Sequence, residues 1–226
     1  MSFVNFRRKF ACALALTAAA AMAAGCADSN DGPRAEETEQ AFLAAMAPHH
    51  ESAIAMAGVA SKRAAHPRLK ELADAVVETQ QAEIAKIALI HMRVTGEALR
   101  ANADAHQQLG LSAEQAGMMH GGPEEVAELR RAKPFDRAFI DAMVPHHQGA
   151  IRMARAVLAV SEDAELRRLA ERIVADQSRE IEQMNQWRAA WYGAPSPSGG
   201  VPKSESADEE AMDGSEREPG GGHEGH

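Results

Sequence analysis

The stretch F-L-A-A-M-A-P-H-H-E-S-A-I-A-M-A at residues 42–57 returns at residues 139–154 as F-I-D-A-M-V-P-H-H-Q-G-A-I-R-M-A. The repeat continues without gaps, so that residues 42–96 align with residues 139–193 at a constant offset of 97. Of the 55 aligned positions 18 are identical, and 10 of these fall in the first 16. An internal repeat of this length indicates one supersecondary unit used twice. We therefore expect two copies of one folding unit.

Each copy has the periodicity of two helices joined by a short turn. We expect helices at about Glu39–Ala60 and Pro67–Met92, and again at Phe135–Val160 and Ala164–Trp191. The second helix of each copy has apolar residues at spacings of three and four, namely Leu69, Leu72, Ala73, Val76, Ile84 and Ile87, and Leu166, Leu169, Ala170, Ile173, Ile181 and Met184. Such hairpins can bury these stripes against each other. The sequence predicts an all-α four-helix bundle made of two repeated helical hairpins.

The two ends of the chain differ from the repeated part. Residues 1–26 have the basic start and short apolar run of a signal peptide, and end in a lipoprotein-like cleavage site at Cys26. We expect lipidation of Cys26 and a protein anchored to the membrane outside the cytoplasm; the alternative is a cleaved signal and a soluble secreted or periplasmic protein. Residues 27–37 are expected to form a tether and residues 38–193 the helical domain. Residues 194–226, rich in Pro, Ser, Gly and Glu, are expected to be a disordered tail.

Composition excludes several functions. The formal net charge of -9 argues against a nucleic-acid partner, which would need cationic groups for its phosphates. The only cysteines are Cys12 and Cys26, both in the signal segment, so the mature domain has no disulfide and no cysteine metal ligand or nucleophile. Helix packing must supply the stability, with a metal as a possible addition.

The histidine pairs lie on one face of the first helix of each copy. At about 100° per residue, the side chains that share this face are Met46, His49, His50 and Met56, and in the second copy Met143, His146, His147 and Met153. The apolar stripe of the second helix is interrupted by Gln80 and Glu83, and by their mates Gln177 and Glu180. Buried polar groups need partners, and the facing histidines are the natural ones. A glutamate that accepts an imidazole N–H would also support that imidazole as a metal ligand.

The mixture of methionine and histidine points to copper. Thioether sulfur is a poor ligand for magnesium, calcium or manganese and a good one for Cu(I), whereas imidazole also suits Cu(II) and zinc. We therefore expect Cu(I) or Cu(II), with zinc as a weaker fit. The alternative is a structural bundle whose histidines, glutamines and glutamates form a buried hydrogen-bond network, because methionine commonly fills helical cores. The recurrence in both halves favours metal binding.

Three further features are less specific. Pro48 and Pro145 precede the histidine pairs, and either bend a helix or begin a new one. The connector, residues 97–133, is expected to hold one or two short helices and a Ser112 cap with Gln115. It also carries the run Met118, Met119 and His120, which could capture copper or be an ordinary loop. In the tail, His223 and His226 could bind a divalent ion loosely or be solvated.

The blocks F-D-R-A-F-I-D-A-M-V-P-H-H-Q-G-A-I-R-M-A (135–154) and A-E-R-I-V-A-D-Q-S-R-E-I (170–181) closely resemble the bacterial family called domain of unknown function 305. The likeness covers about residues 38–193. The resemblance implies a ferritin-like bundle that is usually exported, often lipid-anchored and in some members copper-binding. It also implies binding residues at the His-His and Met positions of both copies, with Glu83 and Glu180 as supports.

Three functions compete on this sequence. The first is an exported, membrane-anchored copper-binding protein that sequesters the ion or transfers it to an unidentified partner. The second is a structural or interaction bundle without metal. In either case the protein could form a homo-oligomer. The third is a ferritin-like metalloenzyme; it is disfavoured because no Glu-x-x-His motif of the di-iron enzymes occurs in the chain, and no catalytic motif was found.

Overall fold

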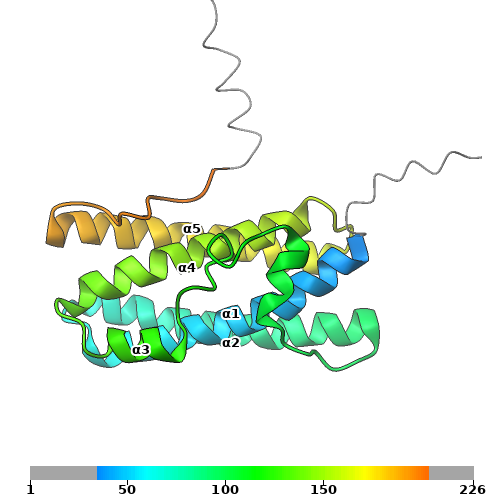
Figure 1. Cartoon of the computed structure of the whole chain (residues 1–226), viewed down its shortest axis with the longest axis horizontal. Coiled ribbons are helices and arrows are strands. Elements are labelled where there is room, and N and C mark those ends of the chain that lie inside the picture. Colours follow the sequence, from blue (N-terminus) through cyan, green and yellow to red (C-terminus); the bar gives the residue numbers. More distant parts are fainter. Residues whose placement is uncertain (1–34, 204–226) are drawn as a thin grey trace, which may run out of the picture. The chain divides into compact units, whose positions relative to one another are not determined.

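The computed structural model describes residues 35–203, and every regular element in this part of the chain is a helix. The elements are α1 Ala35–Arg63, α2 Pro67–Thr95, the 3-10 helix η1 Ala103–Leu109, α3 Pro123–Leu129, α4 Phe135–Leu158 and α5 Ala164–Tyr192. Helices α1 and α2 form one hairpin of the repeat, and α4 and α5 form the other (Figure 1). The prediction of an all-α bundle of two helical hairpins is confirmed. The expected signal segment with Cys26, and residues 204–226, lie outside the described residues.

Local sequence sets the ends of the second helix in each hairpin. Helix α2 begins with Pro67, at a position where the missing N–H costs no helical hydrogen bond. Helix α5 begins after Asp163, whose carboxylate accepts two N–H bonds of the first turn, each at 2.9 Å. Both helices end at a glycine in the left-handed region, Gly96 at φ 74° and Gly193 at φ 88°. These two glycines occupy equivalent positions of the repeat, so the two copies share the backbone conformation that ends the second helix.

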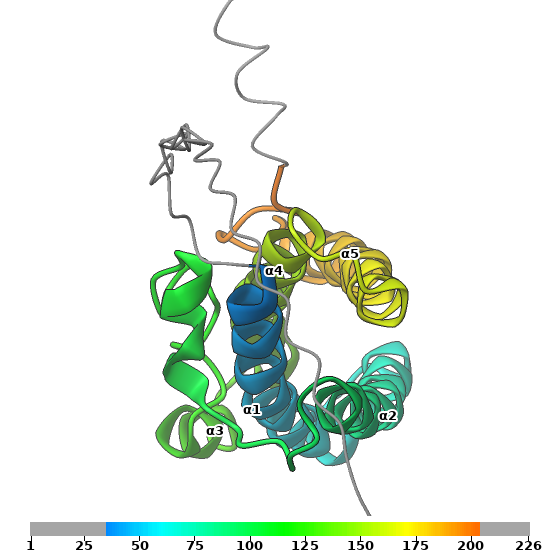
Figure 2. The same ribbon diagram turned by 90° about the vertical axis from the view of Figure 1, so that its right-hand side faces the viewer.

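Helices α1 and α4 pack antiparallel in the middle of the bundle. Just after α4, Ser161 donates a 2.6 Å hydrogen bond to Glu39 near the start of α1. At the other end, the guanidinium of Arg63 lies 5.0 Å from the ring centroid of Phe135, and Asp136 accepts backbone N–H bonds from the turn after α1. Figure 2 shows the pair with α2 and α5 on one side and the connector on the other. The equivalent helices of the two copies are thus related by an approximate twofold rotation.

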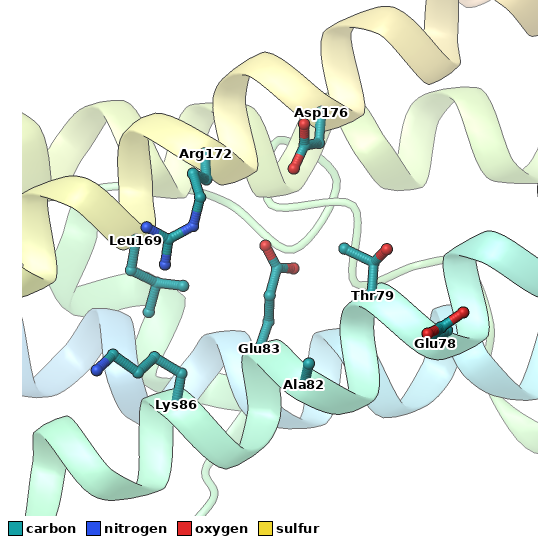
Figure 3. Close-up of a pocket in the computed structure, with 8 residues that line it drawn as sticks. All are labelled: Glu78, Thr79, Ala82, Glu83, Lys86, Leu169, Arg172 and Asp176. Atoms are coloured by element: carbon teal, nitrogen blue, oxygen red, sulfur yellow. The ribbon is translucent and has the colours of Figure 1, made fainter.

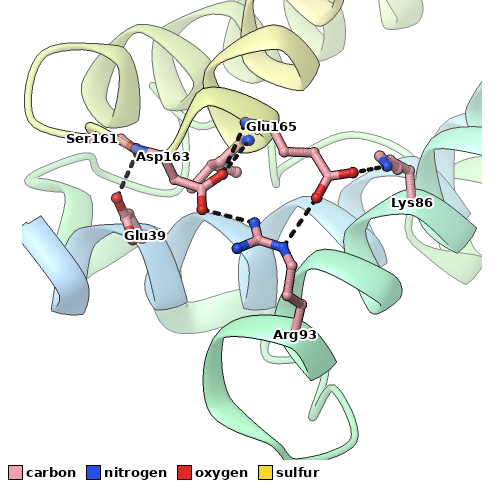
Figure 4. Close-up of polar contacts among 7 residues, drawn as sticks. Glu39, Lys86, Arg93, Ser161, Asp163 and Glu165 are labelled. Atoms are coloured by element: carbon pink, nitrogen blue, oxygen red, sulfur yellow. Dashed lines mark hydrogen bonds and ion pairs between the residues drawn. The ribbon is translucent and has the colours of Figure 1, made fainter.

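Polar contacts join α2 to α5 at one end (Figure 4). Lys86 forms an ion pair with Glu165, and Arg93 bonds to Asp163 at 2.7 Å and to Glu165 at 3.0 Å. These contacts link the C-terminal part of α2 to the start of α5, so the outer helices also run antiparallel. Exposed ion pairs of this kind contribute little, about 0–1 kcal/mol each.

The buried apolar residues form two clusters at opposite ends of the α1–α4 contact. One cluster contains Met56 and Met143, and the other contains Met46 and Met153. Burying one large apolar side chain contributes roughly 1.5–3 kcal/mol, which exceeds the contribution of a surface ion pair. These two clusters therefore contribute most to the stability of the bundle. On each of α1 and α4, the histidine pair lies in sequence between a methionine of one cluster and a methionine of the other.

The structure corrects the prediction of a disordered tail for residues 194–203. Arg188, which is buried, donates to the carbonyl oxygens of residues 194 and 195 at 2.7 and 2.9 Å. Gln148 donates to the carbonyl oxygens of residues 198 and 200 at 2.8 and 2.6 Å. The prediction of disorder rested on the small apolar surface of this segment. The segment is ordered because its backbone carbonyl oxygens accept hydrogen bonds from buried donors on α4 and α5.

The expected tether is also too long at its C-terminal end, because residues 35–37 belong to α1. Glu36 and Glu37 lie in the first turn, where negative charge interacts favourably with the helix dipole. Gln40 adds a hydrogen bond to Glu36 at 3.3 Å, one turn along the helix. The prediction treated these residues as tether because they are polar, although acidic residues favour the first turn of a helix.

The connector contains two short helices, η1 and α3, as expected. Ser112 and Gln115 cap each other reciprocally: the Gln115 side chain accepts from Ser112 N–H at 2.9 Å, and the Ser112 hydroxyl accepts from Gln115 N–H at 3.1 Å. Pro48 and Pro145 lie inside α1 and α4, so neither begins a new helix. Within residues 35–203, no helix is both long and apolar enough to cross a bilayer.

Candidate metal site

Four imidazoles meet where α1 crosses α4. His49 and His50 come from α1, His146 and His147 from α4, and each is at most 1% exposed. The rings of His49 and His146 face each other, with 3.7 Å between their centroids and 35° between their planes. Within each pair the centroids are 6.3 and 6.2 Å apart, both with 56° between the planes. The antiparallel packing therefore merges the two histidine pairs into one histidine cluster with approximate twofold symmetry.

The outer histidine of each pair contacts a glutamate of its own hairpin. His50 Nε2 lies 2.8 Å from Glu83 Oε2, and His147 Nε2 lies 2.6 Å from Glu180 Oε2. The contact that the sequence suggested between facing helices is thus present in both halves. Because a carboxylate only accepts, Nε2 carries the proton in each ring and the lone pair is on Nδ1.

Several buried ring nitrogens in the cluster have no hydrogen-bond partner within the described residues. They are the Nδ1 atoms of His50, His146 and His147. The ring of His49 has no side-chain partner and lies beside the backbone of His146 and Ala116; one of its nitrogens carries the proton and the other the lone pair. A buried polar atom without a partner costs about 1–3 kcal/mol, so native proteins rarely accumulate such atoms at one place. Imidazole nitrogens with free lone pairs are metal ligands, and a metal ion would satisfy them. The donor set therefore fits a metal ion.

Burial keeps the two central imidazoles neutral. Desolvation, with a smaller contribution from the neighbouring histidines, lowers the pKa of His49 well below its ordinary value. The same causes, desolvation first and then His49 and the other histidines, lower the pKa of His146. Both rings are therefore unprotonated at neutral pH, which is the state that binds metals.

The four methionines lie on both sides of the histidine cluster and are fully buried. Met46 shares a core cluster with Met153, and Met56 shares the other with Met143. Each thioether pair thus takes one methionine from each repeat, because α1 and α4 are antiparallel. The methionines of the two repeats are therefore mixed in each core cluster.

The glutamines of the repeat do not contact the histidines. Gln80 and Gln177 are each 2% exposed, but in residues 35–203 no hydrogen bond joins either amide to a ring nitrogen. The amide oxygen of Gln80 and both amide atoms of Gln177 have no partner in this part of the chain. The expectation that they pair with the histidines is wrong, because the glutamates one turn further along fill that position.

A groove between α2 and α5 leads to the glutamates. One part, about 490 Å³, is lined by Glu78, Thr79, Ala82, Glu83 and Lys86 from α2 and by Leu169, Arg172 and Asp176 from α5 (Figure 3). Another part, about 300 Å³, is lined by residues that include Glu180. The side chains of Glu83 and Glu180 are 10% and 17% exposed. Each carboxylate therefore contacts a buried histidine and also reaches the groove.

On the opposite side, the connector packs directly on the histidine helices. Ser52 Oγ lies 2.5 Å from His146 Nε2 and also donates to the carbonyl oxygen of His49 at 3.0 Å. Sequence reasoning assigned Ser52 no contact with a histidine, although its place in the repeated stretch, one turn after His49, was a signal. In the second copy this position is Gly149, where a Cβ atom would lie 2.1 Å from the carbonyl oxygen of Ala116. The connector thus requires the two copies to differ here.

In residues 35–203, no three side chains of histidine, cysteine, aspartate or glutamate are grouped so that they could hold a metal ion together. The glutamates form hydrogen bonds with the outer rings, and the central rings lie 3.7 Å apart between centroids with 35° between their planes. A coordination shell built from those residue types alone is therefore not present. Ligation in this cluster would depend on a small number of imidazoles, with the buried thioethers beside them.

Comparison with known proteins shows the family and similar solved structures. The profile described as "Domain of unknown function (DUF305)" matches residues 39–188 and 152–219. CopM in the Cu(I)-bound form has a TM-score of 0.57 and 34% identity, covering 68% of this chain and 97% of CopM. CopM in the Cu(II)-bound form has a TM-score of 0.56 and 33% identity, with the same coverage. A DUF305 fragment from Deinococcus radiodurans has a TM-score of 0.58 and 26% identity over 70% of this chain and 99% of that one. No curated protein matches the chain significantly.

Proposed function

The chain belongs to the family of the domain of unknown function 305, and on this premise we propose that it binds monovalent copper in the histidine cluster. The ion is cargo that the protein sequesters or passes on. The observation that carries the proposal is the group of buried ring nitrogens without partners where α1 crosses α4. The similarity to CopM, which was solved with Cu(I), Cu(II) and silver, supports the choice of metal.

The surroundings favour a monovalent ion over a divalent one. Placing charge in a site whose imidazoles are at most 1% exposed carries a desolvation cost that rises with the charge of the ion. Zinc binds in closed tetrahedral sets of nitrogen, sulfur and oxygen ligands, and residues 35–203 hold no such group of histidine and carboxylate ligands. The thioethers of four buried methionines flank the cluster, and soft sulfur ligands select Cu(I).

Glu83 and Glu180 would orient the outer rings of the cluster. Each accepts the Nε2–H of its histidine, which fixes the tautomer and leaves Nδ1 as the ligand atom. Their negative charge also offsets the positive charge of a bound ion. Because both carboxylates reach the groove between α2 and α5, they would attract a cation toward the buried rings from that side.

Export and anchoring complete the proposal. The signal segment and Cys26 would place the bundle outside the cytoplasm on a lipid anchor, with the acidic chain exposed to cations there. The chemistry needed is binding and release, so we propose no catalytic residue.

The test is a Cu(I) titration of the full chain under reducing conditions against a chromogenic chelator. We expect the unchanged protein to retain copper, and the variant H49Q/H50Q/H146Q/H147Q to release it to the chelator. The double variant E83Q/E180Q should bind about 10–100-fold more weakly, because a neutral amide oxygen that accepts the Nε2–H raises the basicity of the ring less than a carboxylate and does not offset the charge of the ion.

Two substitutions serve as matched controls. H91Q removes a histidine of α2 outside the cluster, and E78Q removes a carboxylate that lines the same groove as Glu83 without contacting a histidine. Both should retain copper like the unchanged chain, and circular dichroism establishes that each variant is helical. Equal copper retention by the folded quadruple variant would refute the proposal, because the copper would then be held outside the histidine cluster.

A further inference from the structure

The connector segment 117–121 covers the outer wall of the histidine cluster. Gly121 has φ 88°, and a Cβ atom there would lie 2.7 Å from Ser52 Oγ and 3.2 Å from the terminal methyl of Met56. Gly117 has φ 70° and packs equally closely, with 2.8 Å between its Cβ position and the carbonyl oxygen of His146. Only glycine allows this approach, so the segment is fitted to the helices that carry the histidines.

Between these two glycines the segment carries Met118, Met119 and His120. A hollow of about 590 Å³ is lined here by both methionines together with Gly122, Pro123, Glu124, Glu125 and Glu128. Met119 is 65% exposed, whereas Met118 is half-buried and packs against the core cluster that contains Met46 and Met153. The hollow therefore offers two thioethers and three carboxylates to solvent, next to the wall of the buried cluster.

His120 is held in a definite orientation beside this hollow. Its Nδ1 lies 2.9 Å from Glu125 Oε1, and the other carboxylate oxygen accepts the backbone N–H of Gly121 at 2.5 Å. The carboxylate fixes the tautomer with the proton on Nδ1, so the lone pair of Nε2 is available to a metal. A glutamate also contacts a histidine here, but through Nδ1 and not through Nε2 as in the buried cluster, and the side chain of His120 is 30% exposed.

We propose that Met118, Met119 and His120, supported by Glu125, form an outer site that captures a soft monovalent cation and delivers it to the buried histidines. Thioethers and imidazole select Cu(I) and Ag(I) over hard cations, and the neighbouring glutamates attract positive charge. The delivery step rests on the function proposed above, whereas capture stands without it. Gly121, next to His120, leaves no room for a Cβ atom beside Ser52 and Met56, and the Ser52 hydroxyl lies 2.5 Å from His146 Nε2.

The test follows Ag(I), a redox-silent probe for Cu(I), on the full chain with ¹³C-labelled methionine methyl groups. We expect the Met118 and Met119 resonances to shift on binding, both in the unchanged chain and in the variant H49Q/H50Q/H146Q/H147Q. In M118L/M119L/H120Q one equivalent of bound Ag(I) should be lost. The resonances of Met46 and Met56 should still shift in that variant, but more slowly. M92L, which removes another exposed methionine, is the matched control and should behave like the unchanged chain.

The outcomes separate the two proposals. If the buried methionine resonances shift while those of Met118 and Met119 do not, the outer site is refuted and the buried site stands. If Met118 and Met119 shift but the buried resonances never do, capture stands and the delivery step fails together with the proposed function. Unchanged uptake kinetics in M118L/M119L/H120Q would refute delivery alone.

Discussion

The two central histidines lie close together as neutral, tilted rings, although an imidazole also has a charged form near neutral pH. Burial lowers the pKa of His49 and of His146 below the ordinary value of 6.5, because water no longer solvates an imidazolium and the neighbouring rings disfavour a second charge. Their neutrality keeps lone pairs available at a pH where a surface histidine would be partly protonated.

This neutrality makes the metal-free protein sensitive to acid. Above pH 6.5 both rings are neutral in the folded and unfolded states, so they contribute no pH dependence. Below that value the unfolded chain binds protons that the folded chain does not, so the free energy of unfolding falls as the pH falls, until the lowered folded pKa is reached. Each ring contributes up to about 1.4 kcal/mol per pH unit in that window.

The measurement is the urea midpoint of the metal-free chain between pH 8 and pH 5. We expect the midpoint to fall below pH 6.5 and the fall to be smaller in H49Q/H146Q. If the two chains lose stability in parallel, other groups cause the acid sensitivity and the central rings are not kept neutral.

At the scale of elements, the contact between the connector and α4 depends on Gly149. A Cβ at this position would overlap the backbone of Ala116 and Gly117, at 2.1 Å from one oxygen and 2.4 Å from one nitrogen. The equivalent residue of α1 is Ser52, whose hydroxyl reaches His146 instead. One connector therefore makes two different contacts with two related helices.

We predict that G149A is destabilising by about 1–3 kcal/mol, since backbone atoms must move to accommodate the new methyl group. The matched control is G58A in α1, where a Cβ would meet nothing within 4 Å. That substitution should stabilise the protein by up to about 1 kcal/mol, because alanine favours a helix over glycine. Chemical denaturation measures both, and equal effects of the two substitutions would contradict the close contact.

The elements themselves were largely predictable, because their signals are local. Apolar spacing of three and four residues indicated the long helices, and Ser112 with Gln115 indicated a cap that the structure contains. The order of segment 194–203 was not predicted, because it comes from hydrogen bonds donated by Arg188 and Gln148. Both residues lie outside the segment, so its own composition does not indicate these bonds. Contacts made by backbone carbonyls leave no pattern in side-chain composition.

At the scale of the whole molecule, the sequence indicated the contact between each outer histidine and its glutamate, but not how the copies combine. The His50–Glu83 contact lies within one hairpin, so helical periodicity was sufficient to suggest it. The close approach of His49 to His146 and the place of Met46 and Met153 in one core cluster depend on the antiparallel packing of α1 and α4. A gapless repeat is compatible with either direction of packing, so the merging of two motifs into one cluster could not be predicted.

A bound ion in this cluster would join the two hairpins, so we predict that Ag(I) raises the melting temperature. Ligand that binds only the folded state stabilises it by about 2.7 kcal/mol at a free concentration of 100 times the dissociation constant. The increase should be clearly smaller in H49Q/H50Q/H146Q/H147Q and persist in full in H91Q. A calorimetric scan with and without Ag(I) provides the measurement, and a rise of equal size in the quadruple variant would place the stabilising ion elsewhere.

The approximate twofold relation between α1 and α4 is the relation that two separate, identical hairpins would have in a homodimer. In such a dimer the histidine cluster would exist only at protein concentrations above the dissociation constant, and dilution would dismantle it. Residues 97–133 join the two hairpins covalently and replace that association with an intramolecular step at high effective concentration. The cluster consequently assembles to the same extent in a dilute and in a concentrated solution of the protein.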